Sequence, residues 1–201
     1  MTTFAARKSK TLEKFNQYLQ QFPHYTPSIF QDVQPYLFEK TLKTGEFLLQ
    51  EGRTCRNIAF IEKGLIRLYY LNDGKETTLC FCKENNITTS YSSLITQQAS
   101  ETAIQAVEPT KLIMLSYHTL QKLYGQGLFW QQVGRLETEQ EYIRVENHHR
   151  FLRNLSAKDR YLQVLENDPT LLQRVPLNYL ATYLQMAPET LSRIRKKITR
   201  T

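Results

Sequence analysis

Four of the seven glycines divide the first half of the chain into short segments. The segments that flank Gly45, Gly52, Gly64 and Gly74 are rich in β-branched and aromatic residues, which is typical of strands. Asn72-Asp73-Gly74 also supplies a hairpin turn suited to positive φ. Strands are expected at Glu46–Gln50, Asn57–Glu62, Leu65–Leu71, Glu76–Cys82, Thr102–Val107 and Lys111–Ser116. Short, regularly spaced strands without helices between them favour a sandwich or a barrel.

Helices are expected on the N-terminal side of these strands. Phe15, Leu19 and Phe22 recur at helical spacing, which predicts an amphipathic helix over residues 10–22. A second, shorter helix is expected over residues 28–37.

The pattern is helical again from His118 onward. Side chains recur every three or four residues along one face, as in a coiled-coil seam, in which polar members can fix the register. This stripe consists of Trp130, Val133, Leu136, Gln140, Ile143 and Asn147. Because the stripe is longer than one small domain covers, we interpret residues 121–154 as a dimerisation helix that pairs through Val133 and the stripe residues after it. The alternative is that this helix lies on its own β domain.

Composition and charge restrict the class of protein. With 201 residues, 41% hydrophobic and 22% charged, the chain is an ordinary globular protein and not a disordered or low-complexity one. Its net charge of +7 suggests an anionic partner. Residues 150–201 hold ten Lys or Arg against four Asp or Glu, so the positive excess is C-terminal. No stretch has the roughly 18 apolar residues of a membrane span.

The three cysteines are an odd number without a paired framework. This fits a reducing compartment, so we expect a cytoplasmic protein without a structural disulfide. Cys80 and Cys82 fall on one face of a strand, where they are interpreted as small buried hydrophobes, with thiol sensing or zinc ligation as the alternative.

The C-terminal region has the pattern of a helical domain that begins near Leu155. Ser156 and Asp159 resemble a capping box that opens a helix, which Asn167-Asp168-Pro169 ends. Two short helices follow, joined by a tight turn at Gln185-Met186-Ala187 and restarted by Pro188. The inward stripes of these two helices are Leu177, Leu180, Ala181 and Leu184, and then Leu191, Ile194 and Ile198. Residues 176–201 therefore predict a helix-turn-helix.

The outward face of the second of these helices suits DNA. Near the start of such a helix, Glu can accept from a cytosine amino group and Arg can bind guanine through two hydrogen bonds, so Glu189 and Arg193 are the expected base readers, with Thr190 and Ser192 beside them. Phosphate contacts are expected from Asn178, Tyr179, Arg195, Lys196, Lys197 and Arg200. The alternative is a solvated basic helix that closes a small bundle.

These features together resemble the CRP/FNR superfamily, the relatives of the cyclic-AMP receptor protein. The resemblance is carried by Gly45, Glu51-Gly52, Lys63-Gly64, Asp73-Gly74-Lys75-Glu76, the long helix and, most specifically, Pro188-Glu189-Thr190-Leu191-Ser192-Arg193. It implies a homodimer in which an effector in the N-terminal β roll reorients two helix-turn-helix units on a palindromic site. Glu189 and Arg193 fall where the family reads bases. The expected partners are double-stranded DNA, a second copy and RNA polymerase, with no membrane.

Several positions depart from that family. Thr89-Ser90 and Ser100-Glu101 stand where cyclic-nucleotide-binding members have a Gly-Glu and an Arg-Ser pair, so the phosphate-binding Arg is missing and Glu101 would repel a phosphate. Cyclic AMP is therefore disfavoured; Tyr91, Ser92 and Thr102 are left as candidates to line a pocket for another effector. The three cysteines are too few for an iron–sulfur cluster, adjacent His148-His149 cannot ligate as an i, i+4 pair, and neither a metal nor a haem is expected. The chain ends three residues after Ile198, so no β wing is expected, and Gln185 replaces a Gly that relatives favour in the turn.

The expected fold is α+β. It comprises a β roll of the cyclic-nucleotide-binding type (a jelly roll) with N-terminal helices over residues 1–120, the long helix over 121–154 and an all-α helix-turn-helix domain over 155–201. The function that follows is a DNA-binding transcription regulator independent of cyclic nucleotides. The alternative is a small-molecule sensor that acts through protein contacts or nonspecific nucleic-acid binding. An enzyme is disfavoured, because no metal cluster, glycine-rich phosphate loop or activated nucleophile stands out.

Overall fold

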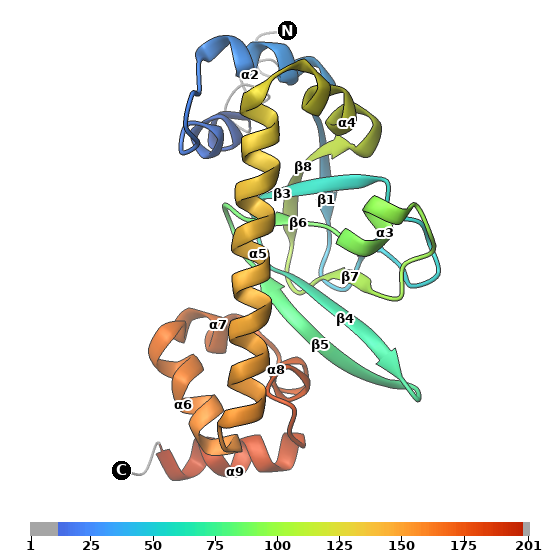
Figure 1. Ribbon diagram of the computed structural model, residues 1–201. Coiled ribbons are helices and arrows are strands. Elements are labelled where there is room, and N and C mark those ends of the chain that lie inside the picture. The colour runs from blue at the N-terminus through green and yellow to red at the C-terminus, as the bar shows by residue number, and fades with distance from the viewer. Residues whose placement is uncertain (1–11, 199–201) are drawn as a thin grey trace, which may run out of the picture.

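The fold has three parts arranged along one long helix, as the computed structural model, which describes residues 12–198, shows (Figure 1). A β roll with helices at one end occupies one half, α5 (Leu128–Asn154) runs the length of the molecule, and four short helices gather at the far end. Over its 27 residues α5 is about 40 Å long. No helix among residues 12–198 has the length and apolar character that crossing a membrane requires.

The β roll consists of two four-stranded antiparallel sheets. One has the order β1-β8-β3-β6 and the other the order β2-β7-β4-β5. The strands are β1 (Phe38–Leu42), β2 (Phe47–Leu49), β3 (Asn57–Lys63), β4 (Ile66–Asn72), β5 (Lys75–Cys82), β6 (Ile87–Thr88), β7 (Ala103–Ala106) and β8 (Thr110–Ser116). All six strands predicted from the glycine spacing are present, whereas β1 and β6 were not predicted. The β4–β5 turn is of the predicted kind, because Asp73 and Gly74 have φ of 49° and 74°.

One group of helices covers one end of the roll, and a second group follows the roll in the sequence. Residues 12–19 are helical, and Phe15, Leu19 and Phe22 are buried as predicted. The remaining helices are α2 (Pro27–Val33), the 3-10 turn η1 (Gln34–Tyr36), α3 (Tyr91–Thr96), α4 (Tyr117–Gln126), α6 (Ala157–Asn167), α7 (Pro169–Arg174), α8 (Leu177–Tyr183) and α9 (Pro188–Ile198). α3 and α7 were not predicted.

Three cores hold the parts together. One fills the space between the two sheets, and a second joins residues 12–22, α2, α4 and the start of α5 to the outer face of β3 and β8. The third is the core of the C-terminal helices, and it includes Leu65 and Val107 of the roll. The C-terminal helices are therefore packed onto the roll and do not merely follow it in sequence.

The long helix begins later than predicted. Gly127 separates α4 from α5, so the segment 121–154 is two helices and the uninterrupted one starts at Leu128. Only the first part of its predicted stripe is covered. Trp130 and Val133 are buried in the core under the N-terminal helices, and Leu136 packs against that core. This part of the helix lies on its own domain, as the alternative interpretation expected.

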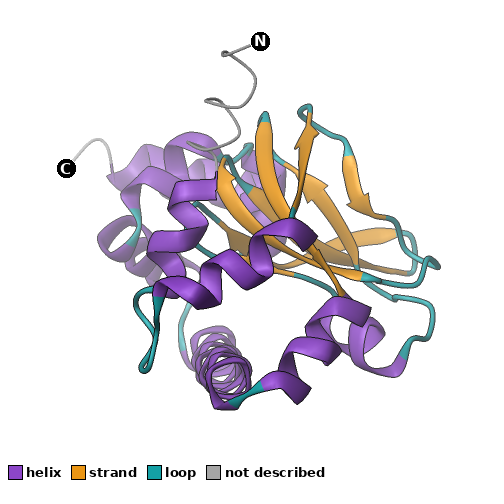
Figure 2. Ribbon diagram, turned by 90° about the horizontal axis from the view of Figure 1, so that it is seen from above, coloured by secondary structure: helices purple, strands orange, loops and turns teal. Residues whose placement is uncertain are grey.

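Beyond that point the stripe is uncovered in the single chain. Gln140, Ile143 and Asn147 are exposed. Figure 2, a view along α5, shows this helix at the margin of the molecule, with the strands on one side of it.

The first helix after α5 begins as predicted. The Ser156 side chain accepts a hydrogen bond from the Asp159 backbone N–H at 3.2 Å and donates to its carboxylate at 2.6 Å, which fixes the start of α6. Asp168 then ends α6 and caps α7, with Pro169 at its first position.

Candidate nucleic-acid interface

The two last helices, α8 and α9, meet through a tightly hydrogen-bonded turn. The Met186 N–H donates to Ala181 O at 3.0 Å and the Gln185 N–H to Thr182 O at 3.2 Å, which is the Schellman pattern. Gln185 occupies the left-handed position with φ of 48°, so a residue other than glycine carries this strain, which costs about 1 kcal/mol. The Arg160 guanidinium donates to Gln185 O at 3.4 Å and supports the turn.

Buried leucines fix the angle at which α9 leaves this turn. Leu180, Ala181 and Leu184 of α8 and Leu191 of α9 are all 0% exposed. Ile194 and Ile198 pack against the same core, so the predicted inward stripe of α9 faces inward. The opposite face of α9 must then point away from the domain.

That opposite face holds the predicted base readers. Glu189 and Arg193 are exposed, and Thr190 and Ser192 beside them are half-buried. Arg193 donates to the Thr190 hydroxyl at 3.3 Å, which connects two of these four side chains.

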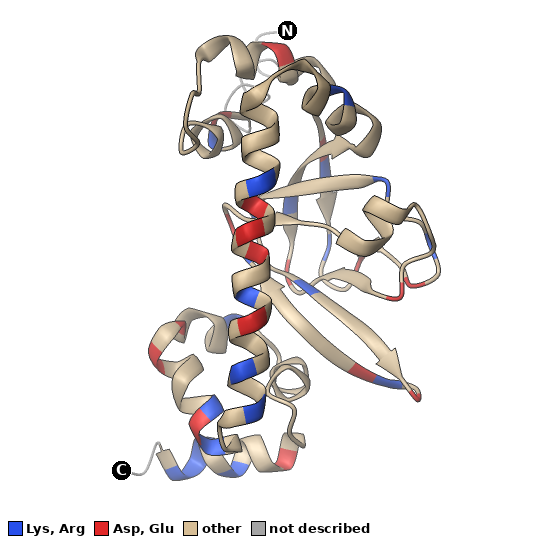
Figure 3. Ribbon diagram, viewed as in Figure 1, with Lys and Arg blue, Asp and Glu red and all other residues tan. Residues whose placement is uncertain are grey.

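Basic residues continue the outward face toward the end of α9. Arg195, Lys196 and Lys197 are exposed in its last turn, where cations also favour the helix dipole. Lys and Arg gather along α9 and around the adjoining ends of α5 and α6 (Figure 3). Arg200, another predicted phosphate contact, lies outside the described residues.

The two predicted phosphate contacts on α8 have different surroundings. Asn178 is exposed. Tyr179 instead faces the roll, with its ring centroid 3.4 Å from the guanidinium carbon of Arg67 in β4. Sequence reasoning did not single out Arg67, because a lone Arg in a strand carries no local signal of a partner more than a hundred residues away.

Arg67 is the centre of a buried polar cluster between the roll and α8. Its side chain is 1% exposed and donates to Glu76 at 2.7 Å and to Gln105 at 2.7 and 3.0 Å. The guanidinium also lies over the Tyr69 ring, at 4.1 Å. A buried charge with this many partners is satisfied, and the Tyr179 ring covers its remaining face.

A second ionic contact holds α7 against the roll. Arg174 donates to Glu84 at 2.9 and 3.0 Å and to Glu108 at 2.7 and 3.2 Å. Partial burial raises the pKa of Glu84. Hydrogen bonds from Arg174 and from the Gly64 N–H lower it by more, so the resulting pKa is about 2. The two carboxylates, Glu108 foremost, raise the pKa of Arg174.

Known proteins match this arrangement in sequence and in fold. Residues 39–126 match the sequence model of a family described as the cyclic nucleotide-binding domain. No curated protein matches the chain. Among solved structures, FixK2 from Bradyrhizobium japonicum superposes with a TM-score of 0.72 at 20% identity, over 82% of this chain and 85% of that one. The chain has the CRP/FNR fold. The fold class and the resemblance predicted from the sequence are confirmed.

Two further solved structures show the same CRP/FNR fold. A transcriptional regulator from Eubacterium rectale, assigned to the CRP/FNR family by its description, superposes with a TM-score of 0.71 at 16% identity, over 91% of this chain and 88% of that one. The c-di-GMP responsive global regulator CLP of Xanthomonas campestris superposes with a TM-score of 0.68 at 17% identity, over 87% and 92%.

Within this CRP/FNR fold, two serine side chains of the segment between β6 and β7 form hydrogen bonds within that segment. The Ser90 and Ser100 hydroxyls are buried and lie 2.8 Å apart, and Ser100 donates to Thr102 O at 2.7 Å. Glu101 is exposed beside them.

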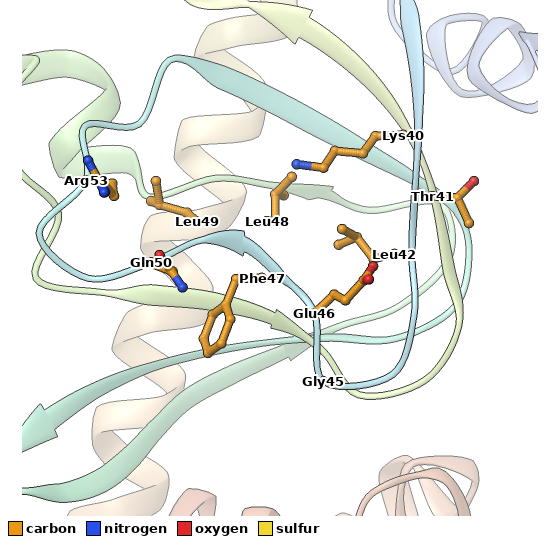
Figure 4. Close-up of a pocket in the computed structure, with 10 residues that line it drawn as sticks. All are labelled: Lys40, Thr41, Leu42, Gly45, Glu46, Phe47, Leu48, Leu49, Gln50 and Arg53. Atoms are coloured by element: carbon orange, nitrogen blue, oxygen red, sulfur yellow. The ribbon is translucent and has the colours of Figure 1, made fainter.

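The three predicted effector residues differ in exposure and lie at or near the surface. Tyr91 is 52% exposed, with its hydroxyl 3.3 Å from Thr138 of α5, Ser92 is exposed and Thr102 is half-buried. A shallow pocket of about 650 Å³ lies elsewhere on the roll, between β1 and β2, and is lined by residues 40–42, 45–50 and 53 (Figure 4). It combines apolar Leu48 and Leu49 with the cations Lys40 and Arg53, and none of its residues was predicted.

Cys80 and Cys82 share a face of β5, as expected. Their sulfurs lie 4.0 Å apart and pack against the core between the sheets. All three cysteines are free thiols.

Proposed function

We propose that this chain is a transcription regulator that binds palindromic DNA as a homodimer and reads bases from the start of α9. The observation that carries the proposal is the exposed pair Glu189 and Arg193, one helical turn apart, on a helix whose opposite side is anchored by the fully buried Leu191. The basic end of α9 supports phosphate contacts by Arg195, Lys196 and Lys197.

The homodimer is proposed to form through α5. Ile143 is 56% exposed on the predicted seam, with polar Gln140 and Asn147 one turn before and after it. Over its 27 residues α5 is covered near its start by the core under the N-terminal helices and near its end by α8, against which His148 and Phe151 pack, so a partner helix fits along its exposed middle. In this proposal residues 1–120 are the sensor, 121–154 the dimerisation segment and 155–201 the DNA-binding unit, with RNA polymerase as a further partner.

Binding to genomic DNA fragments, measured by mobility shift at moderate salt, tests the proposal. Arg193→Ala should cost about 1 to 3 kcal/mol and relax preference at one base pair, because a bidentate contact to a base is lost. Lys196→Ala, the matched control on the same helix, should weaken all sequences alike and reduce the salt slope by about one. Loss of affinity for every DNA alike in Arg193→Ala would refute the base-reading role, and no preference for any fragment over random DNA would refute the function.

The proposed regulator does not depend on cyclic nucleotides. The support is the mutual hydrogen bond of Ser90 and Ser100, which occupies hydroxyls that a phosphate would need, beside the carboxylate of Glu101. Calorimetric titration of the whole chain with cyclic AMP should therefore give no saturable heat at micromolar concentration, and micromolar binding would refute this part of the proposal.

A further inference from the structure

A second cavity lies between the N-terminal helix, the turn after β5 and the middle of α5. It has a volume of about 350 Å³, and its walls are residues 18, 21, 22, 85–87, 136, 137, 140 and 144. None of these belongs to the segment between β6 and β7 or to the pocket between β1 and β2. Three parts of the chain that are distant in sequence thus enclose one polar space.

Tyr18 presents an unsatisfied hydroxyl to this cavity. The residue is 6% exposed and its ring packs among those of Phe15, Phe22 and Phe60, with centroids 5.1 to 6.1 Å away, so its polar end is the part left to reach the cavity. The hydroxyl makes no hydrogen bond of normal geometry with residues 12–198, and the nearby acceptor that it faces is the Glu137 carboxylate. Burial, followed by the nearby carboxylate of Glu137, raises the pKa of Tyr18, so the hydroxyl stays protonated. A buried hydroxyl without a partner is unfavourable unless something else binds it.

The cavity is also lined by a carboxylate, that of Glu137. Glu137 has no ion pair within the described part of the chain, whereas Arg144, at the same cavity, pairs with Glu141. Asn86 donates its side-chain N–H to Glu84 O at 3.2 Å, which leaves its side-chain oxygen as an acceptor. A carboxylate, a phenol oxygen and an amide oxygen therefore line one space.

We propose that this cavity binds a small primary ammonium compound. An ammonium group has three donors and no acceptor, which matches the acceptors of Glu137, Tyr18 and Asn86, and its charge neutralises the carboxylate. Free α-amino acids and aliphatic diamines share this group. An amino acid would in addition place its carboxylate near Arg144. Such a ligand would link the N-terminal helix to α5 next to Gln140, and its binding does not depend on the DNA-binding proposal.

Isothermal titration of the full, extensively dialysed chain tests this site, with the free L-amino acids and putrescine as probes and no DNA present. At least one probe should bind saturably. Glu137→Gln should weaken that binding about tenfold or more, since a charge-assisted hydrogen bond is lost. Tyr18→Phe should also weaken it while leaving the thermal midpoint close to that of the unmodified chain, because the hydroxyl makes no hydrogen bond of normal geometry with residues 12–198. Glu146→Gln, an exposed carboxylate elsewhere on α5, is the matched control and should bind as the unmodified chain does.

Arg144→Gln separates the two classes of ligand: it should weaken binding of an amino acid and leave that of putrescine unchanged. The proposal is overturned if the folded chain binds none of the probes. It is equally overturned if Glu137→Gln and Tyr18→Phe both bind with unaltered affinity.

Discussion

Glu84 accepts hydrogen bonds from both the roll and the C-terminal helices. Its carboxylate receives the Gly64 N–H at 2.9 Å and the Arg174 guanidinium at 2.9 and 3.0 Å. These donors hold its pKa at about 2, below the ordinary value of 4.5, despite the opposing effect of partial burial. A carboxyl group with a depressed pKa in the folded state stabilises that state above its unfolded pKa and ceases to do so as the pH falls through the folded pKa.

The stabilising effect of Glu84 should therefore be complete above about pH 4.5 and disappear toward pH 2. Glu84→Gln should lower the thermal midpoint at neutral pH, and the difference from the unmodified chain should shrink across that acid range. Thermal unfolding of both proteins at a series of pH values measures this. A difference that stays constant down to pH 2 would show that the Glu84 charge does not stabilise the contact.

Local signals account for the helices and strands that the sequence could predict. Positive φ at Asp73-Gly74 and the Ser156 cap are decided by neighbouring residues, and both are observed. β1 was not predicted, because four of its five residues are exposed and its sequence shows no alternation of buried and exposed residues. Pairing with β8 sets its position instead. Gly127 lies within a helical pattern, so the break between α4 and α5 carries little signal in the sequence.

The candidate site follows the same rule. The exposure of Glu189 and Arg193 follows from the three-to-four spacing of Leu191, Ile194 and Ile198, so the sequence alone predicts it. The orientation of Tyr179 depends on Arg67, which is distant in the chain, and no local pattern encodes it. The Tyr18 cavity likewise needs three separate segments to come together.

The exposed middle of α5 yields a prediction about assembly. Ile143→Glu should weaken the proposed dimer roughly a hundredfold, because it buries a charge at the seam, while the chain still folds, since this side chain is 56% exposed in the single chain. Sedimentation equilibrium of the variant measures the change. Val145→Glu is the matched control, because it alters an exposed apolar residue of the same helix that lies off the seam. Equal dissociation in the two variants would contradict the proposed pairing.

The roll holds the C-terminal helices through several kinds of contact. Leu65 and Val107 extend the core of those helices into the roll, the Thr78 and Thr182 hydroxyls lie 2.7 Å apart, and Lys83 pairs with Asp168 at 2.7 Å. The roll therefore contacts α7 and α8, and α9 packs on α8 and α6.

The contact of Arg67 with Tyr179 is a part of this attachment that one substitution can test. Tyr179→Leu keeps an apolar side chain against the core but removes the aromatic face over the guanidinium, a loss of about 1 kcal/mol. Backbone amides of α8 should then exchange with solvent deuterium roughly fivefold faster, because local separation of α8 from the roll becomes easier. Amides of β3, at the far side of the roll, serve as the internal control and should keep their rates. Unchanged exchange in α8 would contradict the prediction and would mean that the remaining contacts alone hold α8 against the roll.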